Sequence, residues 1–89
     1  MTRRVEIAAA AKLELAALDP EAATRVVDFV RDQVAMLADP RSIGKALPTS
    51  EWGQFWKYAV AGYRVIVQIE EPVLRILIVR PAEWRGVFR

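Results

Sequence analysis

The sequence predicts an α+β fold in which an N-terminal strand and a helical hairpin pack on an antiparallel sheet. Residues 8–18 are rich in Ala, Leu, Glu and Lys, and residues 26–37 carry valines and a leucine at helical spacing. Residues 55–80 instead hold three runs of Val, Ile and aromatic residues, separated by turn-forming residues. Helices followed by a run of strands indicate the α+β class. The chain of 89 residues is long enough for one domain, residues 1–89.

The first two elements are a short strand and an alanine-rich helix. Residues 3–7 alternate Val and Ile with Arg and Glu, which is typical of a strand. Residues 8–18 consist largely of strong helix formers. We expect Leu13 and Ala17 to share one face of this helix and Glu14 to point toward solvent.

The second helix has a clear start and stop. Asp19 suits the N-cap and Pro20 the first helical position. The helical pattern then runs to Ala38, and Asp39-Pro40 ends it. Apolar residues at helical spacing predict the buried face: Val26, Val27, Val30, Val34 and Leu37.

The second half of the chain predicts a loop and an antiparallel meander. Glycine, proline and serine between residues 41 and 54 indicate a loop. Three strands are expected at residues 55–60, 63–69 and 73–80, with turns at Ala61-Gly62 and at residues 70–72 and with Pro81 ending the last strand. The helices should cover one face of this sheet and leave the other partly open.

Composition excludes several kinds of chemistry. The chain has no cysteine and no histidine, so it has no disulfide framework, no Cys- or His-ligated metal and no histidine-based catalytic triad. Chemistry would have to come from Lys, Arg, Glu, Asp, Tyr or Ser, and we expect neither a metal nor a cofactor. No secretory signal or apolar run of about 18 residues is visible, so a cytoplasmic protein that does not bind membranes is expected.

The charge is divided unevenly along the chain. Residues 1–39 carry 5 basic and 7 acidic residues, a balance of −2, whereas residues 40–89 carry 8 basic and 4 acidic, a balance of +4. This basic half can be ordinary solubilising charge. It also suits the phosphates of single-stranded nucleic acid, because basic side chains alternate with aromatic ones, or an acidic protein partner.

Three segments around the predicted sheet form a recognisable pattern: Ile43-Gly44-Lys45-Ala46-Leu47, Phe55-Trp56-Lys57-Tyr58 and Gly62-Tyr63-Arg64-Val65-Ile66. They are similar to the patterns G-K-x-L and L-W-R-Y-R-V-G-D-Y-R-V-I-Y. On these residues and on the order of elements, the chain resembles the RelE branch of the RelE/ParE toxin superfamily. The resemblance covers essentially the whole chain and implies a RelE-like fold similar to microbial ribonucleases.

This resemblance implies the toxin of a type II toxin–antitoxin module. RelE-like toxins cleave mRNA in the ribosomal A site and are neutralised by a cognate, RelB-like antitoxin. A toxin–antitoxin heterotetramer is the family-level expectation. The family often acts without a metal, because fixed cations can stabilise the negative charge that develops when the 2′-hydroxyl of RNA attacks the adjacent phosphate.

The resemblance points to Arg64 as the first candidate catalytic residue and to Lys57 as the second. Alternation places Arg64 with Ile66 and Gln68, on the face opposite Tyr63 and the other apolar residues of that strand. A guanidinium there can grip phosphate in a bidentate way. The alternative for Arg64 is an ion pair with Glu70 or Glu83, and for Lys57 simple protection of a strand.

The remaining candidates come largely from the C-terminal tail. Arg85 is a second catalytic cation and Glu83 a possible general base, or a salt-bridge partner of a neighbouring arginine. The candidate RNA-binding residues are Lys45, Arg80, Trp84 and Phe88. The tail departs from the family pattern because Glu83 and Phe88 stand where histidine and tyrosine are expected. Alanine at position 59 likewise replaces an expected arginine, so catalytic strength is an open question.

Two other functions stay open. A ParE-like gyrase inhibitor has the same fold, although the short tail and the tryptophan in the sheet motif resemble the RelE branch more closely. The third reading is a catalytically weak toxin homologue that acts mainly by binding its antitoxin. Loss of one general acid or base typically costs about 10²–10⁴-fold in rate.

Overall fold

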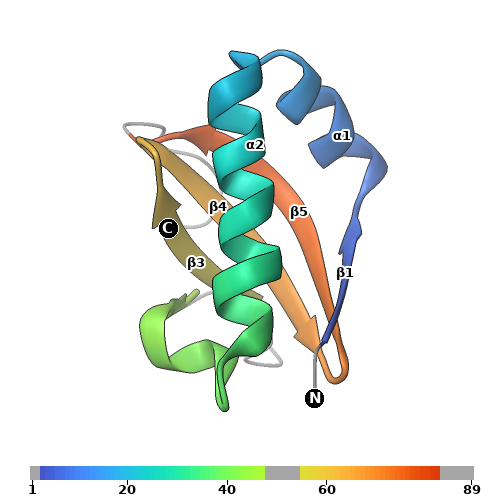
Figure 1. Cartoon of the computed structure of the whole chain (residues 1–89), viewed down its shortest axis with the longest axis vertical. Coiled ribbons are helices and arrows are strands. Elements are labelled where there is room, and N and C mark those ends of the chain that lie inside the picture. The colour runs from blue at the N-terminus through green and yellow to red at the C-terminus, as the bar shows by residue number, and fades with distance from the viewer. Residues whose placement is uncertain (1–2, 48–54, 83–89) are drawn as a thin grey trace.

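A mixed five-stranded sheet lies against a long helix in the computed structural model, which describes residues 3–47 and 55–82 (Figure 1). The elements before the sheet core are β1 (Arg4–Ile7), α1 (Ala9–Ala16), α2 (Pro20–Asp28), η1 (Phe29–Gln33), η2 (Val34–Met36) and η3 (Pro40–Ile43). The remaining strands are β2 (Lys45–Ala46), β3 (Phe55–Val60), β4 (Tyr63–Glu70) and β5 (Val73–Pro81). These bounds confirm the predicted α+β class.

The strand order is β1-β5-β4-β3-β2. The predicted meander of β3, β4 and β5 is antiparallel, as expected. The N-terminal strand, however, joins the sheet in parallel, with Arg4 opposite Val73 and Ile7 opposite Ile76. In the chain, the helical hairpin lies between β1 and the remaining strands. Parallel pairing requires a long crossover connection of this kind.

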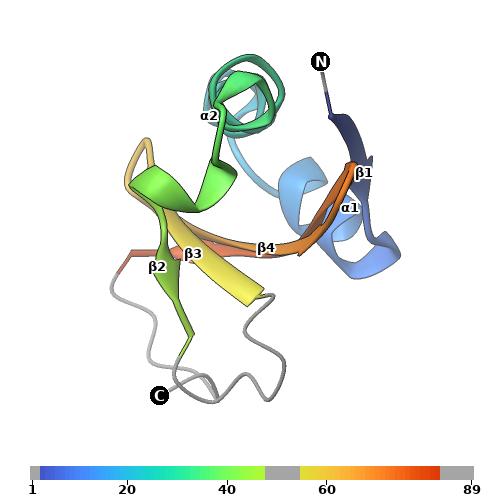
Figure 2. The ribbon, with the colours of Figure 1, turned by 90° about the horizontal axis from the view of Figure 1, so that it is seen from below.

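The second helix begins where the sequence predicts. Asp19 accepts a hydrogen bond from the backbone N–H of Glu21 at 3.2 Å, and Pro20 occupies the first turn. Three valines one turn apart are fully buried against the sheet: Val26, Val30 and Val34. The helix lies across one face of the sheet (Figure 2).

The end of this helix differs from the prediction. After α2 the chain continues through the π-helical η1 and the 3₁₀-helical η2, and it leaves the helix at Met36 rather than Ala38. Leu37 is already extended, with ψ 149°. Asp39-Pro40 does not merely stop the helix, because Asp39 caps η3 by accepting a hydrogen bond from the N–H of Arg41 at 3.0 Å.

The buried face of α1 also differs from the prediction. Ala11 and Leu15 are buried, whereas Leu13 is 75% exposed. Glu14 does not point freely to solvent, since its side chain is 19% exposed and contacts β5. The backbone N–H of Ala8 donates to the carbonyl of Ile76 at 2.9 Å, so α1 starts beside β5 and turns this face toward it.

The segment predicted as a loop after residue 41 contains η3 and the short strand β2. Gly44 lies between them, and a Cβ there would sit 2.8 Å from the ring of Tyr58. The Tyr58 hydroxyl donates to the carbonyl of Pro40 at 2.6 Å, and burial raises the pKa of this tyrosine to about 12. The close approach at a glycine therefore seats the segment against β3. The rest of the predicted loop, residues 48–54, lies outside the described residues.

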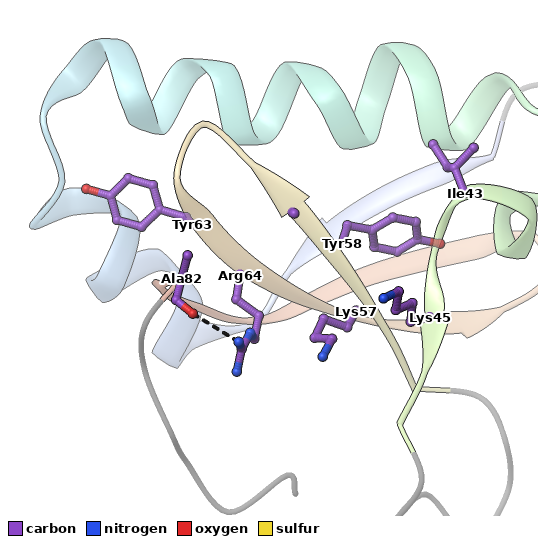
Figure 3. A pocket seen from close by; sticks show the side chains of 8 residues that line it. Ile43, Lys45, Lys57, Tyr58, Tyr63, Arg64 and Ala82 are labelled. Atoms are coloured by element: carbon purple, nitrogen blue, oxygen red, sulfur yellow. Dashed lines mark hydrogen bonds between the residues drawn. The ribbon is translucent and has the colours of Figure 1, made fainter.

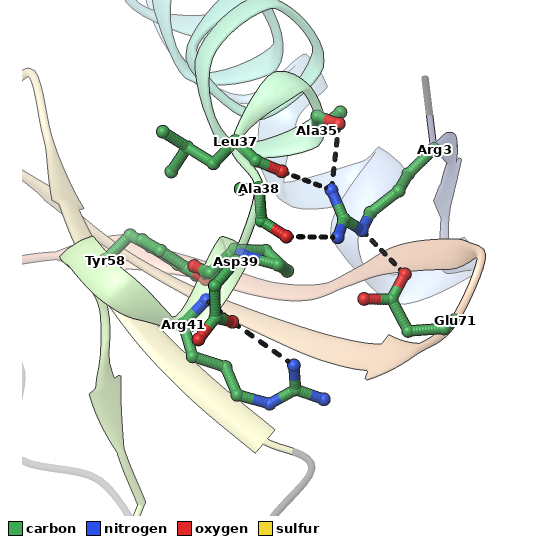
Figure 4. Close-up of polar contacts among 9 residues, drawn as sticks. Arg3, Ala35, Leu37, Ala38, Asp39, Arg41, Tyr58 and Glu71 are labelled. Carbon is green, nitrogen blue, oxygen red and sulfur yellow. Dashed lines mark hydrogen bonds and ion pairs between the residues drawn. The ribbon is translucent and has the colours of Figure 1, made fainter. Parts of the chain in front are cut away.

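Arg3 ties three separate segments together (Figure 4). Its guanidinium donates to the carbonyl oxygens of Ala35, Leu37 and Ala38 at 3.2, 2.6 and 3.1 Å. Its Nε also lies 2.6 Å from the carboxylate of Glu71, in the turn between β4 and β5. These carbonyls lie in the last turn of the helix and just beyond it, where a cation is favourable.

In the described part of the chain, no helix is both long enough and apolar enough to span a membrane.

Candidate nucleic-acid interface

A pocket of about 290 Å³ opens beside β3, beyond the start of β2 at Lys45. Three cations line it: Lys45 from β2, Lys57 from β3 and Arg64 from β4. The other lining residues among the described part of the chain are Ile43, Tyr58, Ala59, Tyr63 and Ala82. No carboxylate is among the lining residues that the structure describes.

Strand register brings the three cations to one side of the sheet. Lys45 lies directly opposite Lys57, and Arg64 lies opposite Ala59, two residues beyond Lys57. Figure 3 shows Lys57 and Arg64 pointing away from the helix. Directly opposed like charges destabilise a sheet. Such an arrangement favours a site that receives an anion.

The backbone helps to hold Arg64 in place. Its Nη2 donates to the carbonyl of Ala82 at 2.9 Å (Figure 3). The N–H of Ala82 in turn donates to the carbonyl of Gly62 at 3.0 Å, which fixes this carbonyl just past β5. Glu70, one alternative partner considered for Arg64, lies 3.4 Å from Arg75 instead.

The predicted division of β4 into two faces is confirmed. Val65, Val67 and Ile69 belong to the core under the helix. Arg64 lies on the other face, as does Ile66, which pairs with Lys57 and is fully buried. That face is therefore less open than expected, because an aliphatic residue is buried within it.

Arg80 lies next to this site but is bound elsewhere. It stands opposite Arg64 in the register of β4 and β5. Its Nε contacts the Oε2 of Glu14 on α1 in a short ion pair. The Oε1 of the same carboxylate accepts a hydrogen bond from the N–H of Val79 at 2.8 Å.

Another ionic network occupies the other end of the same sheet face. The Nη2 of Arg75 lies 2.9 Å from Glu6, and its Nη1 donates to Gln68 at 2.9 Å. The hydrogen bond from Arg75 lowers the pKa of Glu6. Because Glu6 and Glu70 both pair with Arg75, the positive charge at this end is compensated within the described residues.

The structure brings together only part of the predicted site. Lys45, Lys57 and Arg64 share the pocket. The tail candidates Glu83, Trp84, Arg85 and Phe88 lie outside the described residues. Within the described ranges, no three acidic side chains gather in a way that would hold a metal ion.

Several residues of the pocket were missed by sequence reasoning. Tyr63 and Ile43 line it, and the backbone carbonyl of Ala82 binds Arg64. A backbone contact of this kind cannot be predicted from the pattern of side chains. Glu14 was assigned to solvent because an alanine-rich helix does not reveal which face it buries. Ala59 leaves space opposite Arg64, which its small side chain could have indicated.

Comparison with known proteins agrees with this architecture. Residues 5–83 match the family model described as the ParE toxin of the type II toxin–antitoxin system parDE. No curated protein sequence gives a significant match.

Three solved structures have a similar fold. The RelBE2 toxin–antitoxin complex of Mycobacterium tuberculosis matches with a TM-score of 0.76 and 23% identity, over 91% of this chain and 92% of that one. The archaeal RelE–RelB complex of Pyrococcus horikoshii has a TM-score of 0.68 and 25% identity, over 96% and 100% of the two chains. The isolated RelE toxin of E. coli has a TM-score of 0.70 and 17% identity, over 97% and 90%.

The family match covers almost the entire described sheet and both helices, and the fold agrees with those of the RelE toxins. The chain therefore belongs to the ParE toxin family of type II toxin–antitoxin systems, within the RelE/ParE superfamily.

Proposed function

We propose that this toxin is a metal-independent endoribonuclease that cleaves mRNA on the ribosome. The observation that carries the proposal is the pocket beside β3, whose described lining includes Lys45, Lys57 and Arg64 and no carboxylate. Three fixed cations on one side of a sheet suit a phosphate of single-stranded RNA. The apolar part of the lining suits a ribose or base next to that phosphate.

The chemistry follows from charge. The 2′-hydroxyl attacks the adjacent phosphorus, the bond to the 5′ oxygen breaks, and the hydroxyl proton is lost while the leaving oxygen gains one. The phosphoryl oxygens gain negative charge in the transition state, and preorganised cations stabilise that charge. In this proposal Arg64 and Lys57 bind the reacting phosphate and Lys45 the neighbouring one. Arg85 and Glu83 remain candidates for a second cation and a base.

The site is tested by inducing the toxin alone in cells and mapping mRNA ends. We expect growth arrest and cuts within translated mRNAs, and we expect Arg64→Ala to relieve both. Arg31→Ala is the matched control, because Arg31 pairs with Asp28 on the exposed surface of the helix. Full arrest by Arg64→Ala would refute the assignment of Arg64.

The alternative is a gyrase inhibitor, which the match to the ParE family model favours. It predicts DNA breaks and an SOS response on induction, with mRNA left intact. The same induced cultures decide between the two targets, since RNA ends and DNA breaks are measured side by side.

We further propose that a RelB-like antitoxin neutralises the toxin in the cytoplasm. This is supported by the two RelE-type structures above that were solved as toxin–antitoxin complexes. Co-purification with the product of an adjacent small gene, followed by mass measurement, tests the partner and the expected heterotetramer. Harmless expression of the toxin alone, together with tight antitoxin binding, would instead support the catalytically weak homologue.

A further inference from the structure

Two arginines face one another beside the proposed phosphate site. Arg64 and Arg80 are direct partners in the register of β4 and β5, so their side chains leave the same face of the sheet. Opposed like charges at this spacing repel, and both would be drawn to an RNA phosphate placed between them. Among the described residues, the pocket is lined by Arg64 and not by Arg80.

Glu14 forms an ion pair with Arg80. Its Oε2 binds the Nε of Arg80, and its side chain is 19% exposed compared with 43% for Arg80. The helix α1 that carries Glu14 packs on β5, which lies between β1 and β4 in the sheet. Figure 1 shows α1 on the β1 side of β5. The ion pair therefore draws the Arg80 guanidinium away from β4 and Arg64.

The Glu14 carboxylate also accepts a backbone hydrogen bond from β5, which fixes its position. The ladder between β1 and β5 ends at the pair Ile7 and Ile76, so β1 offers no partner to Val79 farther along β5. The Oε1 of Glu14 accepts the hydrogen bond from the N–H of Val79 at 2.8 Å. Two bonds thus hold the carboxylate at the strand edge, where it compensates Arg80.

We propose that Glu14 is an internal counter-ion that restrains RNA binding by holding Arg80 out of the phosphate site. The inference rests on the proposed function for its RNA readout, but the position of Arg80 is measured independently. Loss of the Glu14 charge should release one more cation toward the pocket. Arg80 is in this sense a reserve phosphate ligand, and Glu14 is a positioning residue.

Glu14→Gln is the informative variant. Its amide oxygen still accepts the bond from Val79, whereas its amide nitrogen faces the Arg80 donor and cannot bind it. For a single strand, each added phosphate contact makes the slope of log K against log salt more negative by about 0.7. We therefore expect this variant to bind the oligonucleotide rU12 with a slope steeper by about 0.7, which is roughly a threefold larger loss of affinity between 50 and 200 mM salt.

Two further variants separate this effect from net charge. Glu21→Gln removes the same charge at an exposed position on α2, and its slope should equal that of the wild type. Glu14→Gln combined with Arg80→Gln should lose the added slope. An unchanged slope in Glu14→Gln, or a steep slope that persists in the double variant, would overturn the inference.

Titration with inorganic sulfate, followed through the arginine Nε–Hε resonances, tests the geometry without RNA. In the wild type we expect the Arg64 signal to shift and the Arg80 signal to stay. In Glu14→Gln both should shift. An Arg80 signal that already shifts in the wild type overturns the inference and requires no variant to fold. If no form binds rU12, binding of free RNA in this pocket is refuted, while the sulfate result still decides the role of Glu14 and the mapped mRNA ends still decide the proposed function.

Discussion

The Arg3 guanidinium contacts residues in two distant segments of the chain. Its side chain is 13% exposed and joins three backbone carbonyls and Glu71. Arg3→Ala should lower the free energy of unfolding by about 2–4 kcal/mol, because the partly buried hydrogen bonds to the carbonyls of Ala35 and Leu37 lose their charged donor. Urea unfolding measures this. Arg4→Ala is the control, and it should cost about 0.5 kcal/mol or less, since the Arg4 side chain is 70% exposed.

Acid should reduce the difference between the wild type and Arg3→Ala. The hydrogen bond from Arg3 lowers the pKa of Glu71 below its usual value of 4.5. A carboxylate with a lowered pKa in the folded state stabilises the protein above that usual value and ceases to do so as the pH falls through the lowered one. The two unfolding curves should therefore approach each other below pH 4.5. A constant difference from pH 7 to pH 3 would show that Glu71 contributes nothing.

Tyr58 should make stability sensitive to alkali. Its pKa is raised to about 12 by burial, whereas an unfolded tyrosine ionises near pH 10. Stability is fully present below pH 10 and falls as the pH rises toward 12, by about 1.4 kcal/mol at pH 11. Tyr58→Phe should be less stable than the wild type at pH 8, because the carbonyl of Pro40 loses its donor, and the gap should close at pH 11. All other titrating groups are shared, so the difference isolates Tyr58.

Single residues show what sequence can reveal about a site. The face of Arg64 was predictable because strand alternation with a period of two assigns a face without knowledge of the partner strands. Lys57 was selected by the family resemblance. Lys45 reaches the same pocket because β2 pairs it with Lys57. No sequence pattern predicted this two-residue strand. Glu14 was unpredictable, since its role depends on where β1 ends against β5.

The β3–β4 turn stores a small strain at Ala61. Ala61 and Gly62 both have positive φ, at 52° and 82°, but only glycine adopts that region without cost. Ala61→Gly should therefore raise the free energy of unfolding by about 0.5–1 kcal/mol in urea titrations. Equal or lower stability in this variant would mean that the turn relaxes another way.

Substituting alanine for Gly44 or for Gly62 should destabilise the protein for different reasons. A Cβ on Gly44 would lie 2.8 Å from the Tyr58 ring, whereas one on Gly62 would meet nothing within 4 Å. Gly44→Ala should cost about 1–3 kcal/mol and also weaken RNA binding, since Lys45 follows directly. Gly62→Ala should cost about 1 kcal/mol through its positive φ alone. The contrast is measured by unfolding and rU12 binding, and equal binding by both variants would argue against the seating role of Gly44.

At the level of elements, the sequence predicted a boundary correctly where a capping residue sets it. The predictions were wrong where contacts with distant parts of the chain set the boundary. The start of α2 was encoded locally by Asp19 and Pro20. Its end was not, because the Arg3 guanidinium arrives from a distant part of the chain. The parallel pairing of β1 likewise depends on the path of the hairpin rather than on the residues of the strand.

At the scale of the whole molecule, charge and layers are related. The acidic N-terminal half supplies β1, α1, α2, η1 and η2, and the basic half supplies η3 and the other strands. Acidic side chains from the first half nevertheless reach the sheet, where Glu6 and Glu14 compensate Arg75 and Arg80. Among the described residues, three further cations of the basic half line the pocket beside β3: Lys45, Lys57 and Arg64.

An anion bound in this pocket should stabilise the entire fold. A ligand that binds the folded state alone adds RT ln(1 + [L]/Kd), which is about 1.4 kcal/mol at a tenfold excess over Kd. Sulfate should therefore raise the free energy of unfolding beyond the effect of NaCl at equal ionic strength. Sulfate also stabilises proteins in general by exclusion from their surface, so the comparison needs variants. Lys57→Gln combined with Arg64→Gln should keep the general stabilisation by sulfate and lose the part that comes from binding in the pocket. Lys12→Gln, on the exposed side of α1, should keep both the general and the binding contribution. Equal sulfate increments in all three proteins would show that the opposed cations bind no anion.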